Sequence, residues 1–225
     1  MSQKNNLKLW AISSLVRDIY YFIVANLLFY IAISVPGAWL IFFAPSLLNI
    51  IAIGFLFPGL AALVSCTIKY RESKKEAAIN MVKTFFKGYR GNFKDTIKYC
   101  FIFAIIIFAI IFNFNYYGAE MPLFLIISLG ILISLSSLVM TYMMIIATKF
   151  QFKLKDLFKV SIYCILMHFK RTMKIFITYV ILFFAYPWVG MFTMLLFSSP
   201  IVYLVTHFAY PILDDVYEVF IEKPE

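Results

Sequence analysis

Long apolar runs alternate along this chain with short basic stretches. The apolar runs cover residues 19–68, 99–148 and 175–213, and Glu120 is the single charged residue within them. About 20 apolar residues are enough for one helix to cross the hydrocarbon core of a bilayer, so each run is long enough for two crossings. The pattern predicts an all-α, polytopic membrane helix bundle in which about six transmembrane helices form three hairpins, numbered 1 to 3 in chain order.

Helix-breaking residues indicate where each hairpin turns. Proline and glycine interrupt or end helices. Clusters that contain them predict turns within residues 36–46, 113–122 and 187–200. None of these three segments contains a Lys or Arg residue, so we expect all three turns on the side of the membrane away from the cytoplasm.

The basic residues predict the orientation of the chain in the membrane. All 20 Lys and Arg residues lie outside the apolar runs, and loops rich in Lys and Arg stay in the cytoplasm. We therefore expect both termini to be cytoplasmic. The cytoplasmic parts are a tail over 1–18, a basic helix or loop over 69–98, a basic amphipathic helix over 149–174 and an acidic tail over 214–225.

Both basic segments between the hairpins have apolar residues at steps of three and four, which is typical of amphipathic helices. Such helices lie in the plane of the lipid headgroups or pack against a neighbouring subunit. If a protein partner binds there, the candidate contact residues are Phe85, Phe86, Tyr89, Arg90, Asn92 and Phe93 in the first segment and Leu157, Phe158 and Ile162 in the second.

The composition favours a membrane over nucleic acid as the main partner. The chain is 64% hydrophobic and 14% charged, whereas a soluble domain is usually about half apolar and a quarter charged. A net charge of +9 in a soluble protein would suggest nucleic acid. In this chain the positive residues flank apolar runs, so we expect contact with anionic lipid headgroups and no nucleic-acid partner.

No pattern in the sequence indicates catalysis. The two histidines, His168 and His207, have no companion acids at metal-ligand spacing, and the three cysteines form no CxxC pair. We expect free thiols, no metal, no cofactor and no enzymatic activity. The sequence also lacks a P-loop, a GxSxG and an HExxH motif.

Four residues inside the apolar runs are candidates for an intramembrane polar or kink site. They are Asn26, Pro58, Gly59 and His207. Polar groups and broken helices at membrane depth can mark a substrate path. Helix packing and a simple kink are the competing interpretations, and both are commoner.

Two short segments give the chain a resemblance to a known family. They read Phe-Pro-Gly-Leu-Ala-Ala-Leu over residues 57–63 and Thr-Phe-Phe-Lys-Gly-Tyr-Arg-Gly-Asn-Phe over residues 84–93. With the six-span pattern, they resemble the YesL-like family of bacterial integral membrane proteins, whose molecular function is unassigned. The resemblance implies a multi-pass protein of the bacterial plasma membrane. Members are commonly encoded beside carbohydrate ABC importers and glycan-degrading enzymes, which implies an accessory role in sugar uptake.

Three functional hypotheses follow from these patterns. The first is a non-enzymatic accessory membrane protein that binds the permease or ATPase subunits of a carbohydrate ABC importer and helps to assemble or regulate it. The second is a membrane component of cell-envelope glycan or teichoic acid synthesis. The third is a small independent transporter, which would need a polar cavity near Asn26, Pro58 and His207.

Overall fold

The computed structural model describes the backbone of residues 2–42, 47–117 and 121–222, and the burial of side chains in 13–34 and in most of 56–222. Pro45-Ser46 of the predicted first turn and Glu120 of the second lie outside the described residues. Helices and no strands are present in the described part, which confirms the all-α prediction. The helices are α1 (Ser2–Phe42), α2 (Leu47–Glu72), α3 (Lys74–Ile79), α4 (Met81–Tyr117), α5 (Leu123–Lys149), α6 (Leu154–Met167), α7 (Phe169–Leu196) and α8 (Ser198–Phe220).

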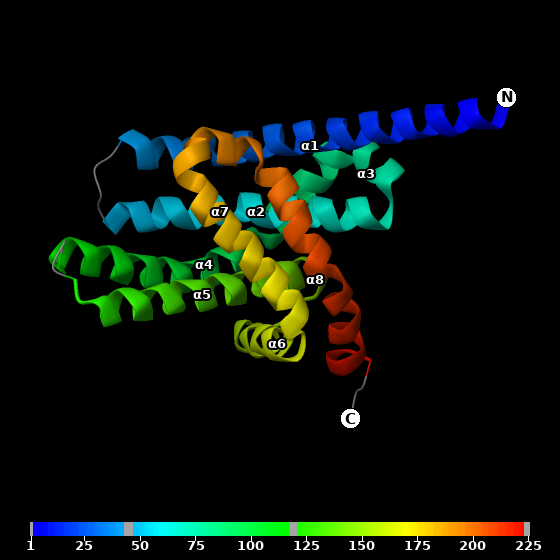
Figure 1. Ribbon diagram of the computed structural model, residues 1–225. Helices are drawn as coiled ribbons and strands as arrows, with labels where there is room; N and C mark the ends of the chain where they lie inside the picture. The colour runs from blue at the N-terminus through cyan, green and yellow to red at the C-terminus, as the bar shows by residue number, and fades with distance from the viewer. Residues whose placement is uncertain (1, 43–46, 118–120, 223–225) are drawn as a thin grey trace.

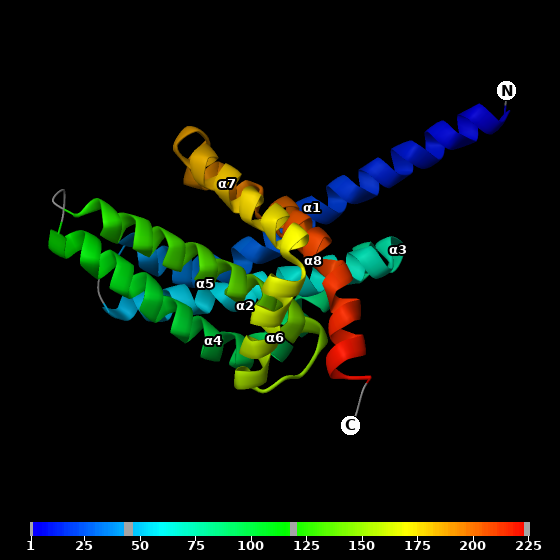
Figure 2. The same cartoon turned by 60° about the horizontal axis from the view of Figure 1, so that its bottom comes forward.

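The helices form two groups (Figure 1). α1, α2, α4 and α5 lie roughly side by side, and α7 and α8 run obliquely across them. The N-terminal part of α1 extends beyond α2 and α3 in both views (Figures 1 and 2). α6 joins the end of α5 to the start of α7 and contacts α8, where the rings of Tyr163 and Phe220 are 5.2 Å apart.

Several helices continue through positions where the sequence predicts a boundary. α1 includes the predicted cytoplasmic tail from Ser2 onward, and α4 runs without a break from the basic segment 69–98 into hairpin 2. Backbone hydrogen bonds within a helix do not depend on side-chain polarity, so a change from basic to apolar residues does not end the helix. Pro187 lies inside α7, and the chain turns at Phe197 between α7 and α8.

α2 is the central helix because its two faces belong to two different cores. Ala61, Val64 and Ile68 recur on one face and pack into a cluster with α4, α5, α6, α7 and α8. Ala62 and Cys66 lie on the other face and pack with α1, α3 and α4. The steps of three and four residues within each set place its members on one side of a helix.

Two helices are long and apolar enough to cross a membrane, among the residues that the structure describes. They cover Ser13–Ser34 and Leu123–Lys149. Only 11% of the most apolar stretch of the second helix is buried inside the protein. A largely unburied apolar helix is unusual in a soluble protein, so the exposure of α5 supports a membrane location. The prediction of six spans is not confirmed.

The third hairpin does not run alongside the first. Its turn contacts α1 at Asn26, whose Oδ1 accepts hydrogen bonds from Ser198 Oγ at 2.7 Å and from the backbone N–H of Ser199 at 2.9 Å. Ser199 Oγ also donates to the carbonyl oxygen of Phe22 at 3.1 Å. Asn26 lies about 24 Å along the helix from the end of α1 at Phe42, at about 1.5 Å per residue. The turn of the third hairpin therefore lies well before the end of α1.

Candidate binding surfaces and cavity

The predicted contact residues of α4 are divided between the core and the surface. Phe85 is 1% exposed and packs in the core between α1 and α2, while Phe86 is 52% exposed. Arg90 is also exposed. The other three predicted residues, Tyr89, Asn92 and Phe93, are half-buried. Phe85 is therefore unavailable to a partner.

The amphipathic helix α6 has apolar residues on two faces. Leu157, Val160 and Cys164 are buried against the body of the protein. The outward face, termed the α6 stripe, has one apolar side chain every four residues, and its members are between 37% and 69% exposed. The members are Leu154, Phe158, Ile162 and Leu166.

Two of the three contact residues predicted in α6, Phe158 and Ile162, belong to the α6 stripe, and the third, Leu157, faces the core. Leu154 and Leu166 extend the stripe and were not among the predicted contact residues. Their spacing of four residues from Phe158 and Ile162 is the signal that identifies them.

The second segment of the family resemblance, residues 84–93, packs against α2 at the end of the first segment and just after it. A Cβ atom built on Gly88 of α4 would lie 2.9 Å from both Cβ and Oγ of Ser65 and 3.5 Å from Cα of Ala62 on α2. Asn92 Nδ2 donates to Ser65 Oγ at 3.4 Å. Small residues let two helices approach closely, so Gly88 and Ser65 explain the close approach of α4 to α2 at this point.

The four candidate intramembrane residues have separate structural roles. Pro58 and Gly59 are buried, and a Cβ on Gly59 would lie 3.3 Å from atoms of Phe29 and Ile33 on α1. Asn26 holds the turn of the third hairpin, as described above.

The fourth candidate, His207, is exposed and pairs with Arg71 of α2, whose Nη1 is 2.9 Å from both its Nδ1 and its carbonyl oxygen. None of the four candidates lines the cavity described next, and they do not form one polar site.

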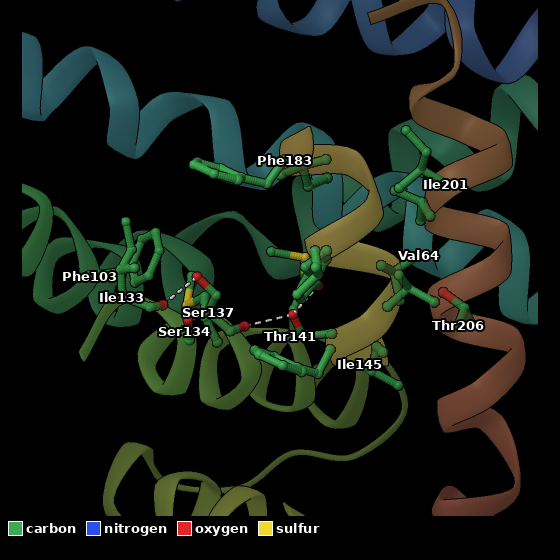
Figure 3. A pocket seen from close by; sticks show the side chains of 18 of the residues that line it. Val64, Phe103, Ile133, Ser134, Ser137, Thr141, Ile145, Phe183, Ile201 and Thr206 are labelled. Atoms are coloured by element: carbon green, nitrogen blue, oxygen red, sulfur yellow. Dashed lines mark hydrogen bonds between the residues drawn. The ribbon is translucent and has the colours of Figure 1, made fainter. Parts of the chain in front are cut away.

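A cavity of about 680 Å³ lies between α2, α4, α5, α7 and α8. Its walls are mainly apolar, with Phe103 and Ile133 on one side, and Val64 and Ile201 on the opposite side (Figure 3). Ligand pockets usually have volumes of roughly 300–1,000 Å³. The size and the lining suit an apolar chain or a small hydrophobic molecule.

The hydroxyl groups in the cavity wall mostly bond to protein atoms. Ser134 Oγ donates to the carbonyl oxygen of Gly130, and Ser137 Oγ to that of Ile133, each at 2.7 Å. Thr141 Oγ1 bonds both the carbonyl oxygen of Ser137 and the hydroxyl of Tyr179 (Figure 3).

Thr206 is the exception in this wall. Its side chain is completely buried, and its Oγ1 has no hydrogen-bond partner. A buried hydroxyl without a partner costs free energy.

No group of three or more His, Cys, Asp or Glu residues in the described part of the chain could hold a metal ion. Cys66, Cys100 and Cys164 are buried free thiols, as the sequence predicts.

The comparisons with known proteins give one match. A family model described as "Protein of unknown function, DUF624" matches residues 22–114, which include both segments of the resemblance. The match does not carry the YesL-like name and does not conflict with it. No curated protein and no solved structure matches the chain.

Proposed function

We propose that this chain is a multi-pass protein of the bacterial plasma membrane with six spans and both termini in the cytoplasm. We further propose that it is a non-enzymatic accessory subunit that binds the permease or ATPase subunits of a carbohydrate ABC importer. The observation that carries the second proposal is the α6 stripe, and the identity of the partner comes from the family resemblance.

The exposed apolar surface of α5 and the position of the basic residues support the membrane arrangement. Arg71 at the end of α2, Lys149 at the end of α5 and Lys174 near the start of α7 lie at one end of the helix bundle, around α8. Positive residues gathered at one end of a bundle favour the cytoplasmic side for that end.

The α6 stripe supports a docking role because the helix cannot turn to bury it. The opposite face of α6 is already packed through Leu157, Val160 and Cys164. The exposed residues Lys155 and Lys159 are close to the stripe in sequence, so the surface combines apolar and positive groups. Such a helix fits a hydrophobic groove with acidic borders on a partner subunit.

Affinity purification of the full chain in mild detergent tests the docking role. We expect the chain to recover permease or ATPase subunits of a sugar importer, and the double variant Phe158→Gln, Ile162→Gln to recover at least tenfold less. Burying one such side chain contributes about 1.5–3 kcal/mol, and about 1.4 kcal/mol corresponds to tenfold in affinity. Phe124→Gln is the matched control because Phe124 is 73% exposed on α5, away from the stripe.

Full recovery of the partner by the double variant would contradict docking through α6. The alternative that the α6 stripe lies in lipid has its own test. An environment-sensitive dye is attached to the new thiol of the Ile162→Cys variant, and the variant is placed in nanodiscs without a partner. A dye signal typical of hydrocarbon in that sample would mean that the stripe lies in lipid. If deletion of the gene alters cell-wall composition but leaves sugar uptake intact, that result would favour the glycan-synthesis hypothesis.

A further inference from the structure

Three positive side chains gather around two aromatic rings of α8. Arg71 Cζ lies 4.5 Å and Lys149 Nζ 5.2 Å from the centre of the Tyr210 ring. Lys174 Nζ lies 5.6 Å from the centre of the Phe208 ring. These residues are termed the Tyr210 cluster, and they come from α2, α5, α7 and α8.

The same four helices form most of the wall of the cavity. A cluster residue follows the last lining residue on α2, α5 and α8 and precedes the first lining residue on α7. On α5, Lys149 comes one turn after the lining residue Ile145. On α8, Tyr210 comes one turn after the lining residue Thr206.

On α7, which enters from the same end, Lys174 comes two residues before the lining residue Phe176, and on α2, Arg71 comes two turns after the lining residue Val64. The Tyr210 cluster therefore lies at one end of the cavity.

The charge of the cluster is only partly balanced by acidic groups. Glu72 Oε1 is 3.9 Å from Lys149 Nζ, and Asp214 is a further acid near Tyr210. Among the described ion pairs, neither Arg71 nor Lys174 has a carboxylate partner within 4.0 Å. Arg71 Nη1 is already hydrogen-bonded to Nδ1 and the carbonyl oxygen of His207, so Arg71 would bind an anion through its other N–H groups, beside the ammonium group of Lys174.

We propose that the cavity and the Tyr210 cluster together bind one anionic membrane phospholipid. Its phosphate group pairs with Arg71 and Lys174, and one acyl chain fills the apolar cavity. Thr206 lies on α8 between these two regions. The order from headgroup to hydrocarbon in a phospholipid matches the order of the cluster and the cavity.

The proposal does not depend on the importer as a partner. Basic pockets between membrane helices on the cytoplasmic side are known to bind anionic lipid headgroups. The apolar cavity distinguishes this site from a simple charged surface because it requires a hydrocarbon chain. Inorganic phosphate should therefore bind much more weakly than the phospholipid.

The test measures lipid retention by the purified full chain in mild detergent, with native mass spectrometry as the readout. We expect one retained phosphatidylglycerol per chain and at least tenfold weaker retention of phosphatidylcholine. The variant Arg71→Gln, Lys174→Gln should weaken phosphatidylglycerol retention roughly 30-fold, since each positive group near the surface contributes about a fivefold preference. It should weaken retention of phosphatidylcholine much less, because the choline cation offsets the charge of the phosphate in that lipid. Lys87→Gln, Arg90→Gln on the exposed face of α4 is the matched control.

A second variant tests the cavity itself. Ser134→Phe fills the cavity and should weaken retention of both lipids, whereas Ser128→Phe, on the same helix and outside the cavity wall, should weaken neither. If Ser134→Phe does not fold, as judged by circular dichroism and gel filtration, Gly130→Phe replaces it. A Cβ atom on Gly130 meets no atom within 4 Å.

Three results would overturn the proposal. The first is normal phosphatidylglycerol retention by the Arg71→Gln, Lys174→Gln variant. The second is normal retention by a folded variant with a filled cavity. The third is competition by inorganic phosphate at the same concentration as the lipid. That result would mean that the site binds free anions and does not need a hydrocarbon chain.

Discussion

Replacement of Gly88 by alanine tests the close approach of α2 and α4 directly. The new methyl group would lie 2.9 Å from Cβ of Ser65. That Cβ atom is fixed to the backbone of α2, so a rotamer change of Ser65 does not relieve the contact. One of the two helices has to move.

The expected size of the effect follows from two opposing terms. Overpacking of a tight contact costs about 1–3 kcal/mol, while alanine is better than glycine in a helix by about 1 kcal/mol. Gly88→Ala should therefore lower the free energy of unfolding by about 0–2 kcal/mol. Gly91→Ala is the control that isolates the contact, because its Cβ meets no atom within 4 Å. It should raise the free energy of unfolding by about 1 kcal/mol.

A pair of second-site changes identifies the atom responsible. Ser65→Gly removes both atoms that lie within 3.0 Å of the new methyl group, and the next atom, Cα of Ala62, is at an ordinary distance of 3.5 Å. Ser65→Ala keeps the Cβ at 2.9 Å. In a double-mutant cycle, Ser65→Gly should restore about 1–3 kcal/mol to Gly88→Ala, and Ser65→Ala should restore much less.

Equilibrium unfolding in mixed detergent micelles, followed by far-UV circular dichroism, measures all of these variants. Equal stability of Gly88→Ala and Gly91→Ala would refute the reasoning. So would rescue by Ser65→Ala as complete as rescue by Ser65→Gly, since the contact would then not be with Cβ.

Two further predictions concern the third hairpin and the cysteines. Asn26→Ala removes the acceptor for Ser199 at the turn and should lower the free energy of unfolding by about 1–3 kcal/mol; the control Asn113→Ala loses a bond only within its own helix and should be near neutral. Burial raises the pKa of the Cys164 thiol to about 12, so a water-soluble maleimide should label Cys164 slowly until the protein unfolds. Because the folded state disfavours the thiolate, the free energy of unfolding should fall by up to about 1.4 kcal/mol per pH unit as the pH rises from 9.0 towards about 12, and Cys164→Ala should reduce that slope. Rapid labelling of the folded protein would contradict this.

The sequence predicts which segments are helical because the signals are local. Apolar runs, helix-breaking clusters and steps of three and four residues all act within a few residues of each other. The second turn shows this, as α4 ends at Tyr117, inside the predicted segment 113–122, and α5 begins at Leu123, the residue directly after it.

Packing between helices is much less accessible to sequence reasoning. α6 is apolar on two faces, and periodicity does not tell which face is buried. The sequence therefore predicts Leu157 as a contact residue together with Phe158, although Leu157 is buried and Phe158 is exposed. Phe85 and Phe86 present the same ambiguity in α4. The partner helix decides burial, and that partner is distant in the sequence.

The cavity and the Tyr210 cluster depend even more on distant residues. Arg71 and His207 are hydrogen-bonded although they are 136 residues apart in the sequence, and neither lies in a local motif. The sequence predicts His207 as a candidate residue, but only the fold identifies Arg71 as its hydrogen-bond partner. Asn26 contacts Ser198 and Ser199 at the turn of the oblique third hairpin. No short-range sequence pattern predicts these contacts.

The unbroken course of α4 has a mechanical consequence. Phe86 lies on its exposed face, and Phe103 lies in the cavity wall, about 25 Å further along the same helix at about 1.5 Å per residue. α4 is one continuous helix between these two residues, so motion at one of them is passed to the other through the helix. Any force that tilts the end bearing Phe86 also shifts Phe103, and whatever fills the cavity resists that tilt in return.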